Sequence, residues 1–234
     1  MTRRDALLAA VAMTAAAASP ISATARVEAD APARPLAPPK SGPVNVAVVV
    51  GEQSTVIDFA GPWEVFQDVQ QGNGFNLFMV SDKMKTLNAT GNMQIVPQYD
   101  FETAPQPQVV FMGAQGEHTP AKIDWIRKMS VKADLVMSNC TGAFLLAQTG
   151  LLDGLSATTH HDFYDQFEKS FPKVKLVRGP RYVEFEKIAT GGGLTSGIEL
   201  ALRVVERYYG TPAAGQTAYY MEYVRSPHRP SAVG

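Results

Sequence analysis

Cys140 is the only cysteine in the chain, and it stands where an apolar strand pattern gives way to an apolar helix pattern. The strand is expected at Leu135–Ser138 and the helix at residues 141–148, with Gly142 two positions after the cysteine. This order is typical of a nucleophile elbow, a sharp turn that projects a nucleophile above the end of a sheet. The N–H groups at a helix start favour a thiolate, so we predict a reactive thiol with a lowered pKa. The alternative is a buried structural cysteine.

Asp58 and Gly113 also follow predicted strands. In an open α/β sheet, ligands bind outside the carboxyl ends of the strands, so these two positions can converge with Cys140 although they are far apart in sequence. A carboxylate beside a thiol can exchange protons with it during catalysis. Asp is also a favoured N-cap, so the alternative for Asp58 is a cap on the helix that follows.

The histidines give weaker indications. His160, His161 and Asp162 are potential metal ligands, but adjacent side chains in a strand point to opposite faces, so we expect no metal site there. His160 is expected near the pocket, orienting or hydrogen-bonding a loop, or else as a structural histidine. His118 follows the Gly113 strand and is expected either to line the pocket or to be exposed. We expect no cofactor, and Gly191-Gly192-Gly193 reads as a tight turn and not as a phosphate-binding loop.

From residue 44 onward, predicted strands alternate with predicted helices, and these elements must position the residues above. Short β-branched runs predict strands, and apolar residues at helical spacing predict the helices between them. This alternation indicates the α/β class with a mostly parallel central sheet and helices on both faces. The strands are expected at residues 44–50, 75–80, 109–112, 135–138 and 188–190, and the helices at 57–69, 121–129, 141–148, 194–208 and 211–223.

Composition excludes several classes of protein. The 234 residues are 45% hydrophobic and 18% charged, which is typical of a globular chain of one or two domains. The formal net charge of −1 argues against a nucleic-acid partner and against binding to an anionic membrane. A single cysteine excludes an intrachain disulfide and any multi-cysteine metal site.

The chain begins with a predicted export signal. Residues 1–25 combine a charged start, a short apolar run and an Ala23-Thr24-Ala25 cleavage site, and Arg3-Arg4 resembles a twin-arginine signal. The apolar run is too short to span a bilayer, so we expect a periplasmic or secreted protein without a stable membrane anchor once the signal is removed. Residues 26–43 contain five prolines and are expected to form a flexible or extended linker. The folded domain is expected at residues 44–224, followed by a flexible tail at 225–234.

Three stretches together resemble the ThiJ/PfpI superfamily, in the branch that holds isocyanide hydratases and the sensor domains of AraC-type regulators. They are SNCTGAFLLAQTGLLDGLSATTH at 138–160, IDFAGPWEVF at 57–66 and TGGGLTSGIELAL at 190–202. The resemblance covers residues 44–224. It implies a flavodoxin-like domain, related to class I glutamine amidotransferases and usually homodimeric, with a small-molecule substrate.

The resemblance also implies roles for individual residues. Cys140 matches the nucleophile, Asp58 the acidic residue that faces it, and Thr141 the residue whose hydroxyl and N–H lie by the site. Gly113 matches the first glycine of a pair whose N–H groups hold developing negative charge. The second glycine is replaced by Ala114, which costs about 1 kcal/mol if the backbone there needs a positive φ. Asn139 stands where an apolar residue is more usual.

The function implied is that of an isocyanide hydratase. Cys140 would attack the terminal carbon, Asp58 would manage the protons, and water would release an N-substituted formamide from a thioimidate. The alternatives are a glyoxalase- or deglycase-like enzyme acting on small aldehydes, and a non-catalytic sensor of a ligand or of thiol oxidation. The residue after Cys140 is not histidine, so a Cys–His dyad of the peptidase-like branch is not expected.

Overall fold

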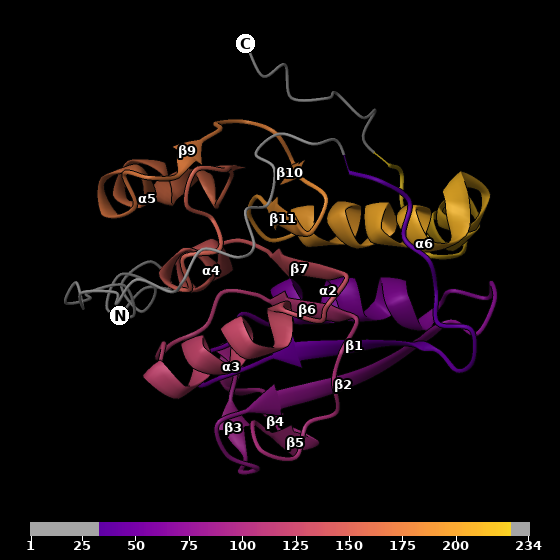
Figure 1. Cartoon of the computed structure of the whole chain (residues 1–234), viewed down its shortest axis with the longest axis horizontal. Helices are drawn as coiled ribbons and strands as arrows, with labels where there is room; N and C mark the ends of the chain where they lie inside the picture. The colour runs from indigo at the N-terminus through magenta and orange to yellow at the C-terminus, as the bar shows by residue number, and fades with distance from the viewer. Residues whose placement is uncertain (1–32, 226–234) are drawn as a thin grey trace.

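A computed structural model describes residues 33–225 (Figure 1). The predicted signal peptide, the first part of the linker and all but the first residue of the predicted tail lie outside these residues. Seven strands form the central sheet in the order β10-β11-β7-β6-β1-β2-β5, and only the β10–β11 pair is antiparallel. The strands are β1 (Val44–Val49), β2 (Phe75–Ser81), β5 (Tyr99–Asp100), β6 (Val109–Met112), β7 (Leu135–Ser138), β10 (Tyr182–Glu184) and β11 (Ile188–Gly191). The mostly parallel sheet predicted from the alternating pattern is confirmed.

Helices cover both faces of this sheet, and the side chains of β1 show how. Val44, Val46 and Val48 pack into a cluster with α2 (Val56–Gln67) and α6 (Ser196–Tyr220). Ala47 and Val49 point to the other face, where they join α3 (Pro120–Ser130), α4 (Gly142–Gln148) and α5 (Tyr164–Ser170). Because alternate residues of a strand face opposite sides, a continuous β-branched run suits a strand that is buried on both faces. Figure 1 shows α2 and α6 beside each other behind the sheet.

The predicted helices at 194–208 and 211–223 are the two parts of α6. They meet at Gly210, whose backbone (φ 85°, ψ 166°) is not helical, and Pro212 follows two residues later. A glycine adopts this conformation without steric cost, and a proline suits the start of a new helical segment. Among the described residues, no helix combines the length and the apolar character that crossing a membrane requires.

Several short elements were not predicted from the sequence. Three of them, β5, β10 and α5, belong to the central sheet and its helices. The others are an antiparallel pair, β3 (Leu87–Asn88) with β4 (Gln94–Ile95), a small parallel pair, β8 (Ser156–Ala157) with β9 (Lys175–Leu176), and two 3₁₀ turns, η1 (Thr90–Asn92) and η2 (His161–Phe163).

The ordered contacts extend beyond residues 44–224. In the described part of the linker, the N–H of Leu36 donates to the carbonyl of Arg207 at 2.7 Å, and Arg207 Nε donates to the carbonyl of Arg34 at 3.0 Å. This stretch therefore lies against α6. At the other end, Arg225 forms ion pairs with Glu199 at 3.1 Å and Glu206 at 3.3 Å.

Candidate active site

Cys140 occupies a sharp turn between β7 and α4, with a left-handed backbone (φ 56°) that is rare outside glycine. Hydrogen bonds to neighbouring loops hold this turn: the N–H of Cys140 donates to the carbonyl of Gly192 at 2.7 Å, and the hydroxyl of Thr159 donates to the carbonyl of Cys140 at 2.9 Å. The predicted nucleophile elbow is therefore present. Its backbone strain is maintained by the loops on either side.

Two glycines make the close packing around the elbow possible. A β-carbon on Gly142 would lie 2.5 Å from the carbonyl oxygen of Met112, and one on Gly113 would lie 2.7 Å from Cβ of Asp58. Neither distance leaves room for a side chain. Gly142 thus lets α4 approach the end of β6, and Gly113 lets α2 bring Asp58 over the end of the same strand.

Asp58 is completely buried, and its carboxylate faces the cysteine. Oδ2 accepts a hydrogen bond from the N–H of Ala114 at 3.0 Å, and Oδ1 accepts one from Nδ2 of Asn139, also at 3.0 Å. The carboxylate is also hydrogen-bonded with the thiol of Cys140. The N-cap of α2 is Thr55, so the interpretation of Asp58 as a helix cap is wrong.

Burial dominates the electrostatics of this pair. It raises the pKa of Asp58 from 3.8 to about 7, against the opposing hydrogen bonds from Ala114, Cys140 and Asn139. It also raises the pKa of the Cys140 thiol, and the negative charge of Asp58 adds to this increase. The predicted lowering of the cysteine pKa is therefore wrong, because the thiol is only 2% exposed and the start of a two-turn helix does not offset desolvation. At neutral pH the thiol keeps its proton, and Asp58 is poised to accept it.

Two backbone N–H groups, from Thr141 and Leu194, hydrogen-bond the sulfur and favour its negative charge. Thr141 was expected beside the site. Leu194 was not, and it also has a left-handed backbone (φ 49°) directly after the three-glycine turn. Its carbonyl accepts a hydrogen bond from Nδ2 of Asn139 at 2.8 Å. Asn139 therefore joins the Asp58 carboxylate to the loop that faces the sulfur. Its polar side chain at a usually apolar position was the only signal of this link in the sequence.

Ala114 differs from the expectation in two ways. It has no positive φ, so its methyl group imposes no backbone strain. Its N–H was expected to stabilise an oxyanion, but it donates to Asp58 and so holds the carboxylate in place. Gly113 contributes by the close approach to Asp58 described above.

His160 lies at the rim of the site, next to Thr159, and its ring packs against Gly193 so closely that a β-carbon there would overlap it. Burial lowers the pKa of this half-buried imidazole. His118 is elsewhere: it is half-buried beside Lys122 and hydrogen-bonded with Gln148 at the far end of α4, and burial lowers its pKa to about 4. The expectation that His118 is exposed is therefore wrong.

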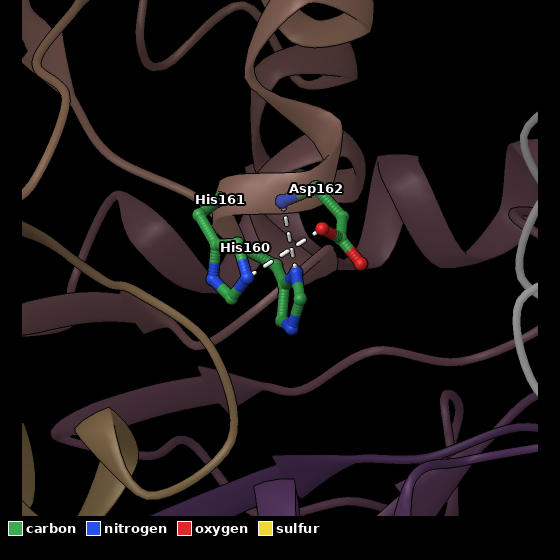
Figure 2. Close-up of side chains that lie close together, drawn as sticks. All are labelled: His160, His161 and Asp162. Carbon is green, nitrogen blue, oxygen red and sulfur yellow. Dashed lines mark hydrogen bonds and ion pairs between the residues drawn. The ribbon is translucent and has the colours of Figure 1, made fainter.

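The local structure of His160 and His161 also differs from the prediction. They form the start of the 3₁₀ turn η2 and not part of a strand, and their rings stack at a centroid distance of 4.4 Å (Figure 2). The argument that their side chains must point to opposite faces is wrong.

The comparisons with known proteins agree with this architecture. The model of the DJ-1/PfpI family matches residues 44–207. The chain is 26% identical to isonitrile hydratase of Pseudomonas putida over 190 residues, 79% of this chain and 80% of that protein. It is 32% identical over 100 residues to the HTH-type transcriptional regulator CdhR of Pseudomonas aeruginosa, which is 43% of this chain and 30% of the regulator. The chain thus spans most of the hydratase and under a third of the regulator.

Solved structures show the same fold. A ThiJ/PfpI family protein from Pseudomonas syringae superposes with a TM-score of 0.71 at 24% identity, covering 82% of this chain and 79% of that one. DJ-1beta of Drosophila melanogaster superposes with a TM-score of 0.68 at 16% identity, covering 78% and 99%. At these identities the likeness concerns the fold alone. Since the family model spans the sheet from β1 to β11 and the elbow within it, the chain belongs to the DJ-1/PfpI family, also known as ThiJ/PfpI.

Proposed function

We propose that this protein is a cysteine-dependent enzyme that hydrates isocyanides (isonitriles) to N-substituted formamides. The observation that carries the proposal is the buried Asp58–Cys140 pair, in which a carboxylate with a pKa of about 7 is hydrogen-bonded with a protonated thiol. A general base is most effective when its pKa lies near the working pH. The similarity to isonitrile hydratase supports the choice of substrate.

In the first half of the proposed reaction, the thiol proton passes to Asp58 while the sulfur of Cys140 attacks the terminal carbon of the isocyanide. Asp58 then delivers this proton to the same carbon, which gives a thioimidate, S–CH=N–R, bound to the enzyme. The N–H groups of Thr141 and Leu194 stabilise the charge on sulfur before the S–C bond forms.

In the second half, water adds to the carbon of the C=N bond, and the nitrogen receives a proton. The resulting tetrahedral intermediate collapses to the formamide, its S–C bond breaks, and the released sulfur regains a proton through Asp58. All atoms balance with water as the only co-reactant, and one carboxylate handles the proton in both halves.

The state of the thiol distinguishes this proposal from a thiol-oxidation sensor. Sulfenic acid forms from an accessible thiolate. The pKa of the Cys140 thiol is raised, so little thiolate is present at neutral pH and peroxide oxidises the sulfur slowly. The second candidate is a ligand-binding module, which is favoured by the similarity to CdhR.

The test is turnover of alkyl and aryl isocyanides by purified protein, with the formamide product identified by mass spectrometry. Cys140→Ser and Asp58→Asn should abolish or greatly reduce turnover with unchanged circular dichroism. Asp68→Asn, which alters an aspartate at the other end of the same helix, is the matched control and should retain full activity. Turnover of 2-oxoaldehydes alone would support the glyoxalase-like alternative, and binding without turnover would support the ligand-binding module.

We further propose that the protein is exported with a mature N-terminus at Arg26 and that it forms a homodimer. The support is the signal pattern of residues 1–25 and the family resemblance. Mass spectrometry of the protein from its native host would find an intact Met1 if the export proposal is wrong. Light scattering during size-exclusion chromatography measures the oligomeric state.

A further inference from the structure

Three side chains with metal-ligating atoms gather where the chain enters η2 (Figure 2). One ligand atom from each of His160, His161 and Asp162 lies within 4.8 Å of the other two. The imidazole rings stack at 4.4 Å with an angle of 22° between their planes. His161 Nε2 and Asp162 Oδ1 are 3.5 Å apart. Figure 2 shows both rings and the carboxylate on the same side of the turn.

The backbone explains why neighbouring residues converge here. His160 is the last extended residue (φ −61°, ψ 134°), and the 3₁₀ turn begins at His161. This change of direction replaces the alternation of a strand, so that successive side chains no longer point to opposite faces.

The spacing of these atoms suits a small transition-metal ion. Ligands at about 2.0–2.1 Å from a tetrahedral zinc ion lie roughly 3.3 Å from one another. The His161–Asp162 pair already has this separation, and the remaining atoms need to close by about 1.5 Å at most. The side chains of His161 and Asp162 are 73% and 44% exposed, so rotation can bring them together without disturbing a packed core.

We propose that His160, His161 and Asp162 bind a divalent transition-metal ion at the rim of the cysteine site. Two imidazole nitrogens and one carboxylate oxygen favour Zn²⁺, Co²⁺, Ni²⁺ or Cu²⁺ over Mg²⁺ and Ca²⁺, which prefer oxygen ligands. Three protein ligands leave at least one coordination position open to water or another ligand.

One existing contact sets the cost of binding. His160 Nδ1 accepts a hydrogen bond from the N–H of Asp162 at 3.2 Å, which is at the long end of the usual range. An ion held by Nδ1 would replace this bond. The packing of the His160 ring against Gly193 favours binding, because it fixes the orientation of the ring before an ion arrives.

The test is titration of protein without a histidine tag, dialysed against a chelator, with Zn²⁺ in a calorimeter and with Co²⁺ in a spectrophotometer. We expect one ion per chain, with visible Co²⁺ absorption bands. His161→Ala and Asp162→Asn should each weaken binding at least tenfold. Both residues are exposed, so circular dichroism should be unchanged.

Two variants are the controls. His228→Ala removes a histidine outside the described residues, and Cys140→Ser removes the only thiol. Both should bind Zn²⁺ as wild type does. The proposal is overturned if wild type binds more weakly than 1 mM, if His161→Ala and Asp162→Asn bind as tightly as wild type, or if Cys140→Ser abolishes binding.

Discussion

Asn139, the residue directly before the cysteine, donates a hydrogen bond of 3.0 Å from Nδ2 to Oδ1 of the Asp58 carboxylate. Both residues are completely buried. The other hydrogen of the same amide goes to the carbonyl of Leu194, and Oδ1 of Asn139 has no hydrogen-bond partner in the described part of the chain. The Asn139 side chain thus acts as a donor only, and the N–H that it donates to Asp58 stabilises the ionised form of the carboxylate.

Asn139→Leu, which is similar in volume, should shift the pH dependence of activity. Without the amide, one carboxylate oxygen loses a buried hydrogen bond that lowers the pKa of Asp58, so this pKa rises from its value of about 7. The acidic limb of the kcat/KM profile should therefore move to higher pH. A profile with an unchanged midpoint would show that Asn139 has no influence on the carboxylate.

Asp58→Asn should lower turnover by about a hundredfold or more, the usual contribution of a positioned acid–base group. The amide is nearly isosteric but cannot accept the thiol proton. The measurement is the kcat for an isocyanide, compared among Asp58→Asn, wild type and the control Asp68→Asn. Turnover within a few fold of wild type would assign the proton transfer to another group.

The activity of wild type should rise with pH through a midpoint near 7. Asp58 must be ionised to accept the thiol proton, and its pKa of about 7 makes the ionised form scarce in acid. Below this midpoint, kcat/KM should fall about tenfold per pH unit. The residual activity of Asp58→Asn should not show this acidic limb. If the limb persists in the variant, the titrating group is not Asp58.

The stability difference between Asp58→Asn and wild type should also depend on pH. Between pH 4 and 7 the unfolded state releases the Asp58 proton while the folded state keeps it, so this group makes wild type less stable as the pH rises. Over about three pH units the difference amounts to at most roughly 4 kcal/mol. Urea unfolding of both proteins at several pH values measures it. As the pH rises to 7, the free energy of unfolding of the variant should increase relative to that of wild type. Above pH 7 the difference should stay constant.

Gly142→Ala should destabilise the protein by about 1–3 kcal/mol, because its β-carbon would meet the backbone of Met112 and Gly113, which cannot rotate away. Gly215→Ala is the matched control within α6. Apart from the adjacent residues and the nearby backbone of its own helix, no atom lies within 4 Å of its added β-carbon, so the variant should be up to about 1 kcal/mol more stable than wild type. Thermal unfolding compares the two, and equal melting temperatures would contradict the packing argument.

The strands that could be predicted are those whose own residues form a recognisable apolar pattern. β1, β6 and β7 are apolar runs between helical segments, and their burial on both faces leaves a nearly continuous apolar pattern. β2 and β11 were recognised by the apolar residues within them, although β2 is only partly buried. β5 and β10 have two and three residues, too few for a period. They are strands because β2 and β11 offer hydrogen bonds at the edges of the sheet.

The site was only partly predictable for a related reason. Cys140 and Asp58 could be found by their positions after strands and by their resemblance to known motifs. The direction of the pKa shift of Cys140 could not be predicted, because it depends on desolvation by residues from several distant segments. The contacts made by Leu194 and Asn139 likewise depend on how the turn after β11 folds over the elbow.

The left-handed backbone of Cys140 lowers the stability of the fold, and the residue that would relieve this strain cannot act as the nucleophile. Glycine is the residue best suited to φ 56°, and any residue with a β-carbon is strained there by roughly 1 kcal/mol. Alanine or serine would keep this strain, whereas glycine would relieve it and remove the sulfur. Stabilisation of the fold alone therefore favours loss of the nucleophile at this position. A search for thermostable variants of this protein should hold residue 140 fixed, because a gain there would come from an inert protein.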